Sequence, residues 1–138
     1  MSAPLSPELA RLVEAARLVR EHAYAPYSGF RVGAAIETPS GAVYAGANVE
    51  NASYGATICA ERSAVACMVA AGESAIARVA VYTEADTLSM PCGICRQVLG
   101  EFAKSATVVA AGPSGARTVP FAELLPEPFG FAPPGVGP

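Results

Sequence analysis

Apolar residues in the first part of the chain recur at helical spacing, beginning just after a serine, a proline and a glutamate. A serine N-cap followed by proline at the first helical position is typical of a helix start. Ser6 and Pro7 therefore predict a helix that runs to about His22. Similar patterns predict two further helices over residues 61–71 and 96–104, and a short helix over 121–125.

Continuous apolar runs and turn residues predict strands elsewhere. Residues 32–38 and 43–49 flank a Pro-Ser-Gly turn and predict a β-hairpin, and further strands are predicted at 77–83, 107–111 and 117–119. Helices that alternate with strands after an opening hairpin indicate the α/β class. We expect a three-layer α/β/α sandwich around a mixed five-stranded sheet. Residues 1–138 are expected to form one domain, with a Pro/Gly-rich tail at 126–138.

The composition narrows the choice of partners. Only 15% of the 138 residues are charged, against about 25% in an average soluble protein. A small domain this poor in charge is expected to cover part of its surface with copies of itself, although alanine richness alone is the alternative. The net charge of −3 disfavours nucleic acid and anionic membranes as partners and favours a small neutral molecule.

The sequence contains no apolar run of transmembrane length and no recognisable signal peptide, so a cytoplasmic location is expected. In a reducing compartment, four cysteines indicate metal or redox chemistry rather than disulfides. His22, the single histidine, is assigned no catalytic role.

Three cysteines fall in two short motifs, Cys59-Ala60-Glu61 and Pro91-Cys92-Gly93-Ile94-Cys95, each at the start of a predicted helix. Unpaired N–H groups and partial positive charge at a helix N-terminus stabilise thiolates. Three thiolates predict a tetrahedral zinc site with one open position, the pattern of catalytic zinc. Cys67 lies about 12 Å along the helix from Cys59, too far to share the metal, and is expected in the core.

These motifs match the signature of zinc nucleobase deaminases, here in its all-cysteine version. Beyond that signature, the sequence resembles the cytidine deaminases of the small homotetrameric type. The resemblance extends from about residue 9 to residue 129, with two mild departures at Met90 and Ile94. It is carried by residues 25–35, 46–55, 57–62 and 91–99.

The resemblance implies a role for each residue of the site. Cys59, Cys92 and Cys95 are expected to bind Zn²⁺, and Glu61 to move protons between water, ring and leaving amine. Because three thiolates leave Zn²⁺ with a net charge of −1, Arg62 is expected to donate to the thiolates rather than bind substrate.

The resemblance also implies the substrate contacts. Phe30 is expected against the cytosine ring, and Ala60 is a further predicted contact. Asn48 and Glu50, which share one side of an extended segment, are expected at the ribose. Phe129 matches an aromatic residue that closes a neighbouring subunit's site, for which Phe131 is a second candidate. Arg96 and Gln97 are interpreted as structural support.

The implied reaction is hydrolysis of free cytidine and deoxycytidine to uridine and deoxyuridine plus ammonia, in pyrimidine salvage, by a homotetramer with sites completed across subunits. The sequence does not distinguish the two nucleosides. One alternative is a deaminase of another cytosine compound such as blasticidin S, although Arg62 directly after Glu61 favours cytidine. A non-catalytic zinc module needs a fourth protein ligand, and none is in reach. A polynucleotide editor needs a basic channel, which an acidic chain does not offer.

Overall fold

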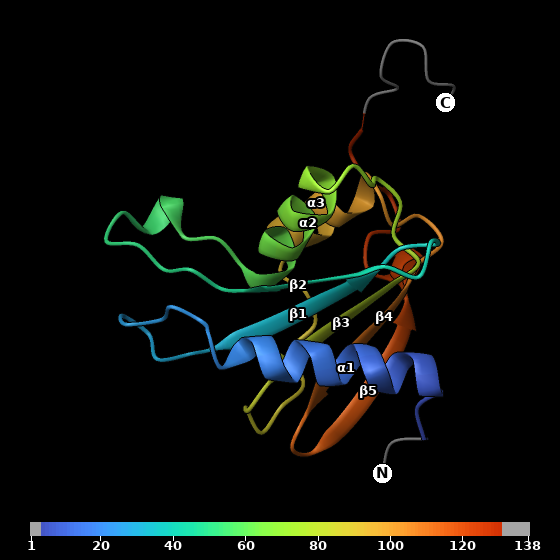
Figure 1. Ribbon diagram of the computed structural model, residues 1–138. Coiled ribbons are helices and arrows are strands. Elements are labelled where there is room, and N and C mark those ends of the chain that lie inside the picture. The colour runs from blue at the N-terminus through green and yellow to red at the C-terminus, as the bar shows by residue number, and fades with distance from the viewer. Residues whose placement is uncertain (1–3, 131–138) are drawn as a thin grey trace.

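The computed structural model describes residues 4–130, which form three layers (Figure 1). The middle layer is a five-stranded sheet in the order β2-β1-β3-β4-β5. Helix α1 covers one face of the sheet, and α2 and α3 cover the other. The helices are α1 (Pro7–Arg20), α2 (Ala60–Ala70) and α3 (Gly93–Gly100), with 3₁₀ turns η1 (Tyr54–Ala56) and η2 (Phe121–Glu123). The strands are β1 (Val32–Glu37), β2 (Val43–Ala47), β3 (Arg78–Thr83), β4 (Thr107–Gly112) and β5 (Gly115–Pro120).

The sheet is mixed, as the sequence predicts. Strands β1 and β2 form the antiparallel hairpin, and β1 also pairs antiparallel with β3. Strands β3 and β4 are parallel, and the connection between them contains α3. Strand β5 returns antiparallel to β4. The predicted α/β/α sandwich and its opening hairpin are therefore confirmed.

Two apolar clusters hold the layers together. Under α1, the sheet presents mostly small side chains such as Ala35 and Ala80 to Leu12 and Ala16. The opposite face packs larger residues, among them Ile36, against α2 and α3. Because successive side chains of a strand point to opposite faces, the neighbours Ala35 and Ile36 serve different clusters.

Several predicted boundaries are wrong. Helix α3 begins at Gly93 rather than residue 96, because Cys92 has the extended conformation of an N-cap, and it ends at Gly100 rather than 104. Helix α1 ends two residues earlier than predicted, at Arg20. The short helix predicted over 121–125 is the 3₁₀ turn η2, and the fifth strand is twice the predicted three residues, 115–120.

Cys67 is exposed, which contradicts its predicted place in the core. Helix α2 buries Ala64, Val65 and Met68 toward the sheet, and Cys67 faces the other way. The helix does run from its cap at Cys59 past Cys67, so the two thiols are separated along one helix as expected. No helix among residues 4–130 has both the length and the apolar character that crossing a lipid bilayer requires.

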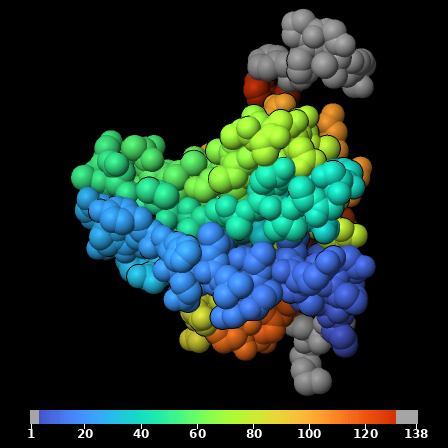
Figure 2. All heavy atoms as spheres, in the orientation of Figure 1, coloured from blue at the N-terminus to red at the C-terminus, as the bar shows by residue number. Residues whose placement is uncertain are grey.

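Two segments, residues 21–31 and 48–59, extend beyond the sheet as one lobe (Figures 1 and 2). Bridges from Val49 to Tyr24 and to Ile58 join them. At the tip, the rings of Tyr27 and Tyr54 meet edge to face, 6.4 Å between centroids. Both rings are largely exposed, Tyr54 to 79%, so the lobe presents an aromatic surface to its surroundings.

The position of α2 depends on the absence of a side chain at Gly46. A Cβ added there would lie 2.4 Å from the backbone nitrogen of Ala64 and 2.8 Å from the carbonyl oxygen of Ala60. These are backbone atoms of α2, which cannot rotate away. Helix α2 therefore lies directly on β2, and the contact sets the place of the helix start at Cys59.

We expect Gly46→Ala to lower the free energy of unfolding by about 2 kcal/mol, because the added methyl group forces the helix off the strand. Urea unfolding at fixed protein concentration measures the loss. Gly55→Ala is the matched control, since a Cβ at Gly55 meets nothing within 4 Å. Equal effects of the two substitutions would contradict the close packing of α2 on β2.

Candidate metal centre and active site

The two cysteine motifs meet where α2 and α3 begin. Cys59 is the N-cap of α2, and Cys92 is the N-cap of α3. Cys95 lies in the first turn of α3 and is fully buried. The sulfurs of Cys59 and Cys92 are 3.7 Å apart. All three sulfurs lie within 4.8 Å of one another.

This geometry fits zinc. With Zn–S bonds of about 2.3 Å, sulfurs at two corners of a tetrahedron lie about 4 Å apart. Within residues 4–130, no other group of three histidine, cysteine or acidic side chains comes close enough to hold a metal ion. Three protein ligands leave the fourth position of a tetrahedral metal open, as in catalytic zinc sites.

Arg62 places the positive charge of its guanidinium group beside the thiol cluster. Its guanidinium donates to Cys59 Sγ at 3.5 Å. In the metal-free site, the pKa of Cys59 is lowered to about 5, first by a hydrogen bond from the Cys95 thiol and then by Arg62 and Cys92. Donating that bond, together with burial, raises the pKa of Cys95. The cluster therefore carries thiolate charge before any metal binds.

Glu61 lies beside the cluster and is only 4% exposed. Burial raises the pKa of its carboxyl group to about 7, and the charge on Cys59 contributes in the same direction. A carboxyl group that titrates near neutral pH is suited to both accepting and releasing a proton during one reaction cycle.

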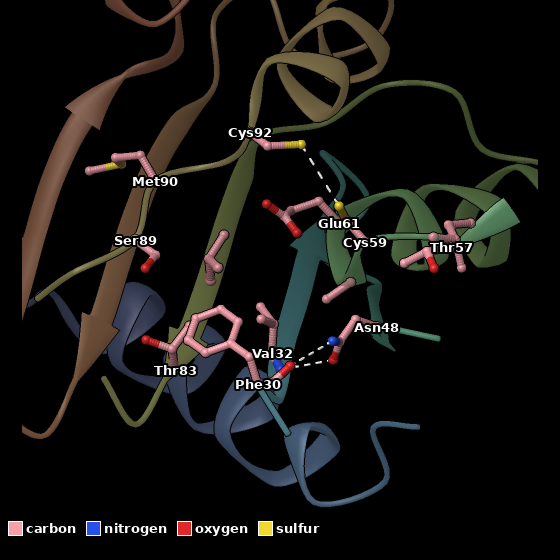
Figure 3. A pocket seen from close by; sticks show the side chains of 13 residues that line it. Phe30, Val32, Asn48, Thr57, Cys59, Glu61, Thr83, Ser89, Met90 and Cys92 are labelled. Carbon is pink, nitrogen blue, oxygen red and sulfur yellow. Dashed lines mark hydrogen bonds between the residues drawn. The ribbon is translucent and has the colours of Figure 1, made fainter. Parts of the chain in front are cut away.

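A pocket of about 190 Å³ opens onto this cluster. Figure 3 shows Cys59, Cys92 and Glu61 near one end and the ring of Phe30 at the other, close to Thr83. Ala60 also lines the pocket. As the first residue of α2, Ala60 has an N–H with no partner inside the helix. The remaining lining residues are Val32, Asn48, Thr57, Ile58, Val81, Ser89 and Met90.

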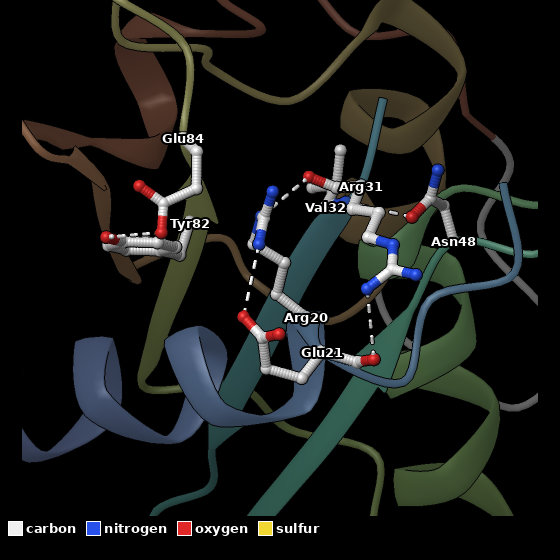
Figure 4. A network of polar contacts seen from close by, with 7 residues as sticks. All are labelled: Arg20, Glu21, Arg31, Val32, Asn48, Tyr82 and Glu84. Atoms are coloured by element: carbon white, nitrogen blue, oxygen red, sulfur yellow. Dashed lines mark hydrogen bonds and ion pairs between the residues drawn. The ribbon is translucent and has the colours of Figure 1, made fainter. Parts of the chain in front are cut away.

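Asn48 is buried and organises the wall that carries Phe30. Its Oδ1 accepts a hydrogen bond from the Val32 N–H at 2.9 Å (Figures 3 and 4), and its Nδ2 donates to the Phe30 carbonyl at 2.8 Å (Figure 3). From the other side, Arg20 Nε donates to the Arg31 carbonyl at 3.2 Å. Residues 30–32 are therefore held from two directions.

Glu50 borders a second pocket of about 350 Å³, which shares Thr57 with the first. Its carboxylate accepts hydrogen bonds from the N–H groups of Tyr27 and Ser28, at 2.9 and 3.1 Å, and from the Ser28 hydroxyl. These bonds, led by that of the Ser28 hydroxyl, lower the Glu50 pKa. Asn48 and Glu50 thus both contact segment 27–32 but line different pockets.

Phe129 does not line the pocket of its own chain. Its side chain is 69% exposed, and its carbonyl accepts a hydrogen bond from Gln97 at 2.8 Å. The alternative candidate, Phe131, lies outside the described residues. The pocket is also lined by Thr57, Thr83 and Ser89, which the sequence motifs do not predict. Thr83 could have been predicted as a pocket residue, because it is a polar residue at the carboxyl end of a buried apolar strand.

A pocket that opens onto a cluster of three thiols and a buried carboxyl group, at two helix starts of an α/β/α sandwich, is the arrangement found in zinc-dependent hydrolytic deaminases. Residues 7–111 match the family model described as the cytidine and deoxycytidylate deaminase zinc-binding region. That match spans most of the described residues, and the chain belongs to this family.

Named relatives and solved structures agree with this family assignment. A cytidine deaminase of Halalkalibacterium halodurans is 42% identical over 120 residues, 86% of this chain and 91% of that protein. The crystal structure of a cytidine deaminase from Burkholderia pseudomallei has a TM-score of 0.84 at 43% identity and covers 91% of this chain and 100% of that one. The cytidine deaminase structure from Mycobacterium tuberculosis has a TM-score of 0.78 at 35% identity, with 91% and 100% coverage.

We expect Asn48→Ala to destabilise the protein by about 2 kcal/mol or more, because it leaves the Val32 N–H and the Phe30 carbonyl without partners. Hydrogen exchange should accelerate at residues 30–32. The control is Asn51→Ala, which removes one exposed hydrogen bond to the Ser53 N–H. Unchanged exchange at 30–32 in Asn48→Ala would show that Asn48 does not organise this wall.

We expect Arg62→Gln to raise the pKa of Cys59 in the metal-free protein, because a neighbouring cation favours the thiolate. At pH 6, just above the lowered pKa of about 5, the rate of Cys59 alkylation should fall about threefold or more. Mass spectrometry of the alkylated peptide measures this rate. The control is Arg117→Gln, which changes an exposed arginine on β5 and should leave the alkylation rate of Cys59 unchanged. An unchanged rate in Arg62→Gln would show that Arg62 does not act on the thiolates.

Proposed function

We propose that the chain is a zinc-dependent cytidine deaminase that hydrolyses free cytidine and deoxycytidine to uridine and deoxyuridine, with release of ammonia. The observation that carries this proposal is a pocket that opens onto a cluster of three thiols and onto a buried carboxyl group with a pKa of about 7. Membership of the cytidine and deoxycytidylate deaminase family supports it.

In this proposal Cys59, Cys92 and Cys95 hold the metal, and Arg62 offsets the excess negative charge of three thiolates. When bound, zinc supplies a Lewis acid that lowers the pKa of a water molecule. Glu61 takes the proton from the attacking water and delivers it to ring N3. After attack at C4, Glu61 transfers the second proton to the departing amino group. One water is consumed for each ammonia released.

The two adjacent pockets suit the two halves of a nucleoside. The first, about 190 Å³, is smaller than the roughly 300–1,000 Å³ of pockets that hold whole drug-sized ligands, and it suits a single pyrimidine ring. Phe30 offers this ring an apolar face, and the Ala60 N–H offers a donor. The second pocket, bordered by Glu50, suits the sugar.

Glu50, which borders the second pocket, and Asn48, which lines the first, are both assigned to the ribose hydroxyls, because the two pockets adjoin at Thr57. Glu50 is ionised, and its carboxylate accepts hydrogen bonds. Asn48 uses one amide hydrogen on the Phe30 carbonyl, and its second remains for a sugar hydroxyl. No lysine or arginine lines either of these two pockets, so a phosphate group would lack a partner. The free nucleoside is therefore the favoured substrate over the nucleotide.

The proposal includes a homotetramer in which Phe129 closes the site of a neighbouring subunit. Its support is the large exposure of Tyr27, Tyr54 and Phe129 together with the low share of charged residues. A single domain across residues 1–138 and a cytoplasmic role in pyrimidine salvage complete the proposal.

We expect Glu61→Gln to retain about one zinc per chain and to lose more than the 10²–10⁴-fold typical of general acid–base catalysis, because Glu61 acts in several proton transfers. The assay follows the loss of cytosine absorbance with cytidine as substrate, and metal analysis uses the same sample. Glu123→Gln, an exposed glutamate away from the pocket, is the control.

An active Glu61→Gln enzyme would overturn the assignment of Glu61. If the wild-type protein bound zinc without deaminating cytidine, the site would stand, and cytosine compounds such as blasticidin S would be tested next. A wild-type protein with neither zinc nor turnover would contradict the proposed function.

A further inference from the structure

The segment that follows β5 lies along α3, the helix that carries two of the three thiols (Figure 1). Phe121 is buried in the cluster beneath the helix. A Cβ built on Gly100 would lie 3.1 Å from Leu125 Cδ2. The absence of a side chain at Gly100 thus allows residues 121–125 to pack closely against the end of α3.

Arg96 joins this segment to the start of the same helix. Its Nε donates to the Pro91 carbonyl at 2.7 Å, and its Nη1 donates to the Leu124 carbonyl at 3.2 Å. Side chains on a helix lean toward its N-terminus, which lets Arg96 reach the residue before the N-cap. The planar guanidinium presents donors in two directions at fixed geometry, and Arg96 uses them on two separate parts of the chain.

The carbonyl of Pro91 belongs to the peptide bond that leads into Cys92. Pro91 is fully buried, so its carbonyl needs a partner within the protein. A cation near a helix N-terminus is unfavourable toward the helix dipole, and helix stability therefore does not explain Arg96. The hydrogen bonds that Arg96 donates to the carbonyls of Pro91 and Leu124 explain its position.

Gln97 makes a separate attachment farther along the segment. Its Nε2 donates to the Phe129 carbonyl at 2.8 Å. This bond holds the backbone of Phe129, whose ring is exposed. Arg96 and Gln97 thus fasten two points of the C-terminal segment to the helix that follows Cys92.

We propose that Arg96 is a positioning residue that holds Cys92 in place for the metal, through the Pro91 carbonyl, and couples this ligand to the C-terminal segment through Leu124. Gln97 positions Phe129 independently of the metal. The proposal rests on the proposed function in taking the metal to be zinc and, for Gln97, in assigning Phe129 to the cytidine site of a neighbouring subunit. Within residues 4–130, Arg96 is not one of the three clustered cysteines and does not line the pocket that opens onto them.

The test measures zinc loss from the full-length, zinc-loaded protein after addition of a chromogenic chelator. Arg96→Met leaves the buried Pro91 carbonyl without its donor, and we expect zinc release to accelerate about tenfold or more, the scale for residues that orient metal ligands. Arg96→Lys keeps a donor for one carbonyl but cannot reach both carbonyls. Its rate of zinc release should lie between those of the wild-type protein and Arg96→Met.

Two further variants separate the roles. Gln97→Ala should release zinc at the wild-type rate while hydrogen exchange accelerates at residues 126–130 and KM for cytidine rises more than kcat falls. The control, Lys104→Met, removes a cation from the groove that Leu125 and Phe121 line and should change neither zinc release nor exchange.

Wild-type zinc release from folded Arg96→Met would overturn the proposal. If Arg96→Met fails to fold, Arg96→Lys decides. In the folded Arg96 variant, faster zinc release together with faster hydrogen exchange at residues 121–125 supports the coupling. Wild-type zinc release and wild-type exchange in that variant refute it. Because the primary readout is zinc retention, absence of cytidine turnover would count against the proposed function and leave this test intact.

Discussion

The structure depends on bringing the starts of two helices to one point on one face of a sheet. Helices α2 and α3 each carry a cysteine at the N-cap, and the sulfurs of Cys59 and Cys92 are 3.7 Å apart. This proximity requires α2 to lie directly on β2, which Gly46 permits, and requires α3 to enter the same layer from the loop after β3. The unpaired N–H groups and dipoles of both helices then act on the same cluster of thiols.

The distribution of charge in the site follows from the meeting of the two helix starts. Positive charge near Cys59 favours its thiolate and lowers its pKa, and Arg62, in the first turn of α2, supplies such charge without lining the pocket. The adjacent Glu61 is buried and so favours its protonated form, which places its pKa near neutrality. One helix turn therefore presents a thiolate, a carboxyl group with a pKa of about 7 and a compensating cation, because successive helix positions point in different directions.

The rest of the site is built from backbone held by side chains. Asn48 and Arg20 hold residues 30–32, so the wall of Phe30 is set by hydrogen bonds as well as by packing. On the other side of the site, Arg96 and Gln97 attach the C-terminal segment to α3. In both places a polar side chain satisfies buried or extended backbone groups that no helix or strand pairs. These bonds fix two segments of little regular structure, one in the pocket wall and one against α3.

The sequence by itself determined the α/β class, the hairpin and the three cysteines that come together in the fold. Local patterns predict these features: apolar periodicity, a serine–proline helix start, and cysteines placed at helix starts. It did not determine that Cys67 is exposed, because the pattern of α2 does not state which side of the helix the sheet covers. It also misplaced α3, since only the folded chain shows Cys92 in the N-cap conformation. The roles of Asn48 and Arg96 as backbone partners were decided by tertiary structure alone, because their acceptors lie on segments up to 28 residues away in the chain, and a hydrogen bond across that separation leaves no periodic trace in the sequence.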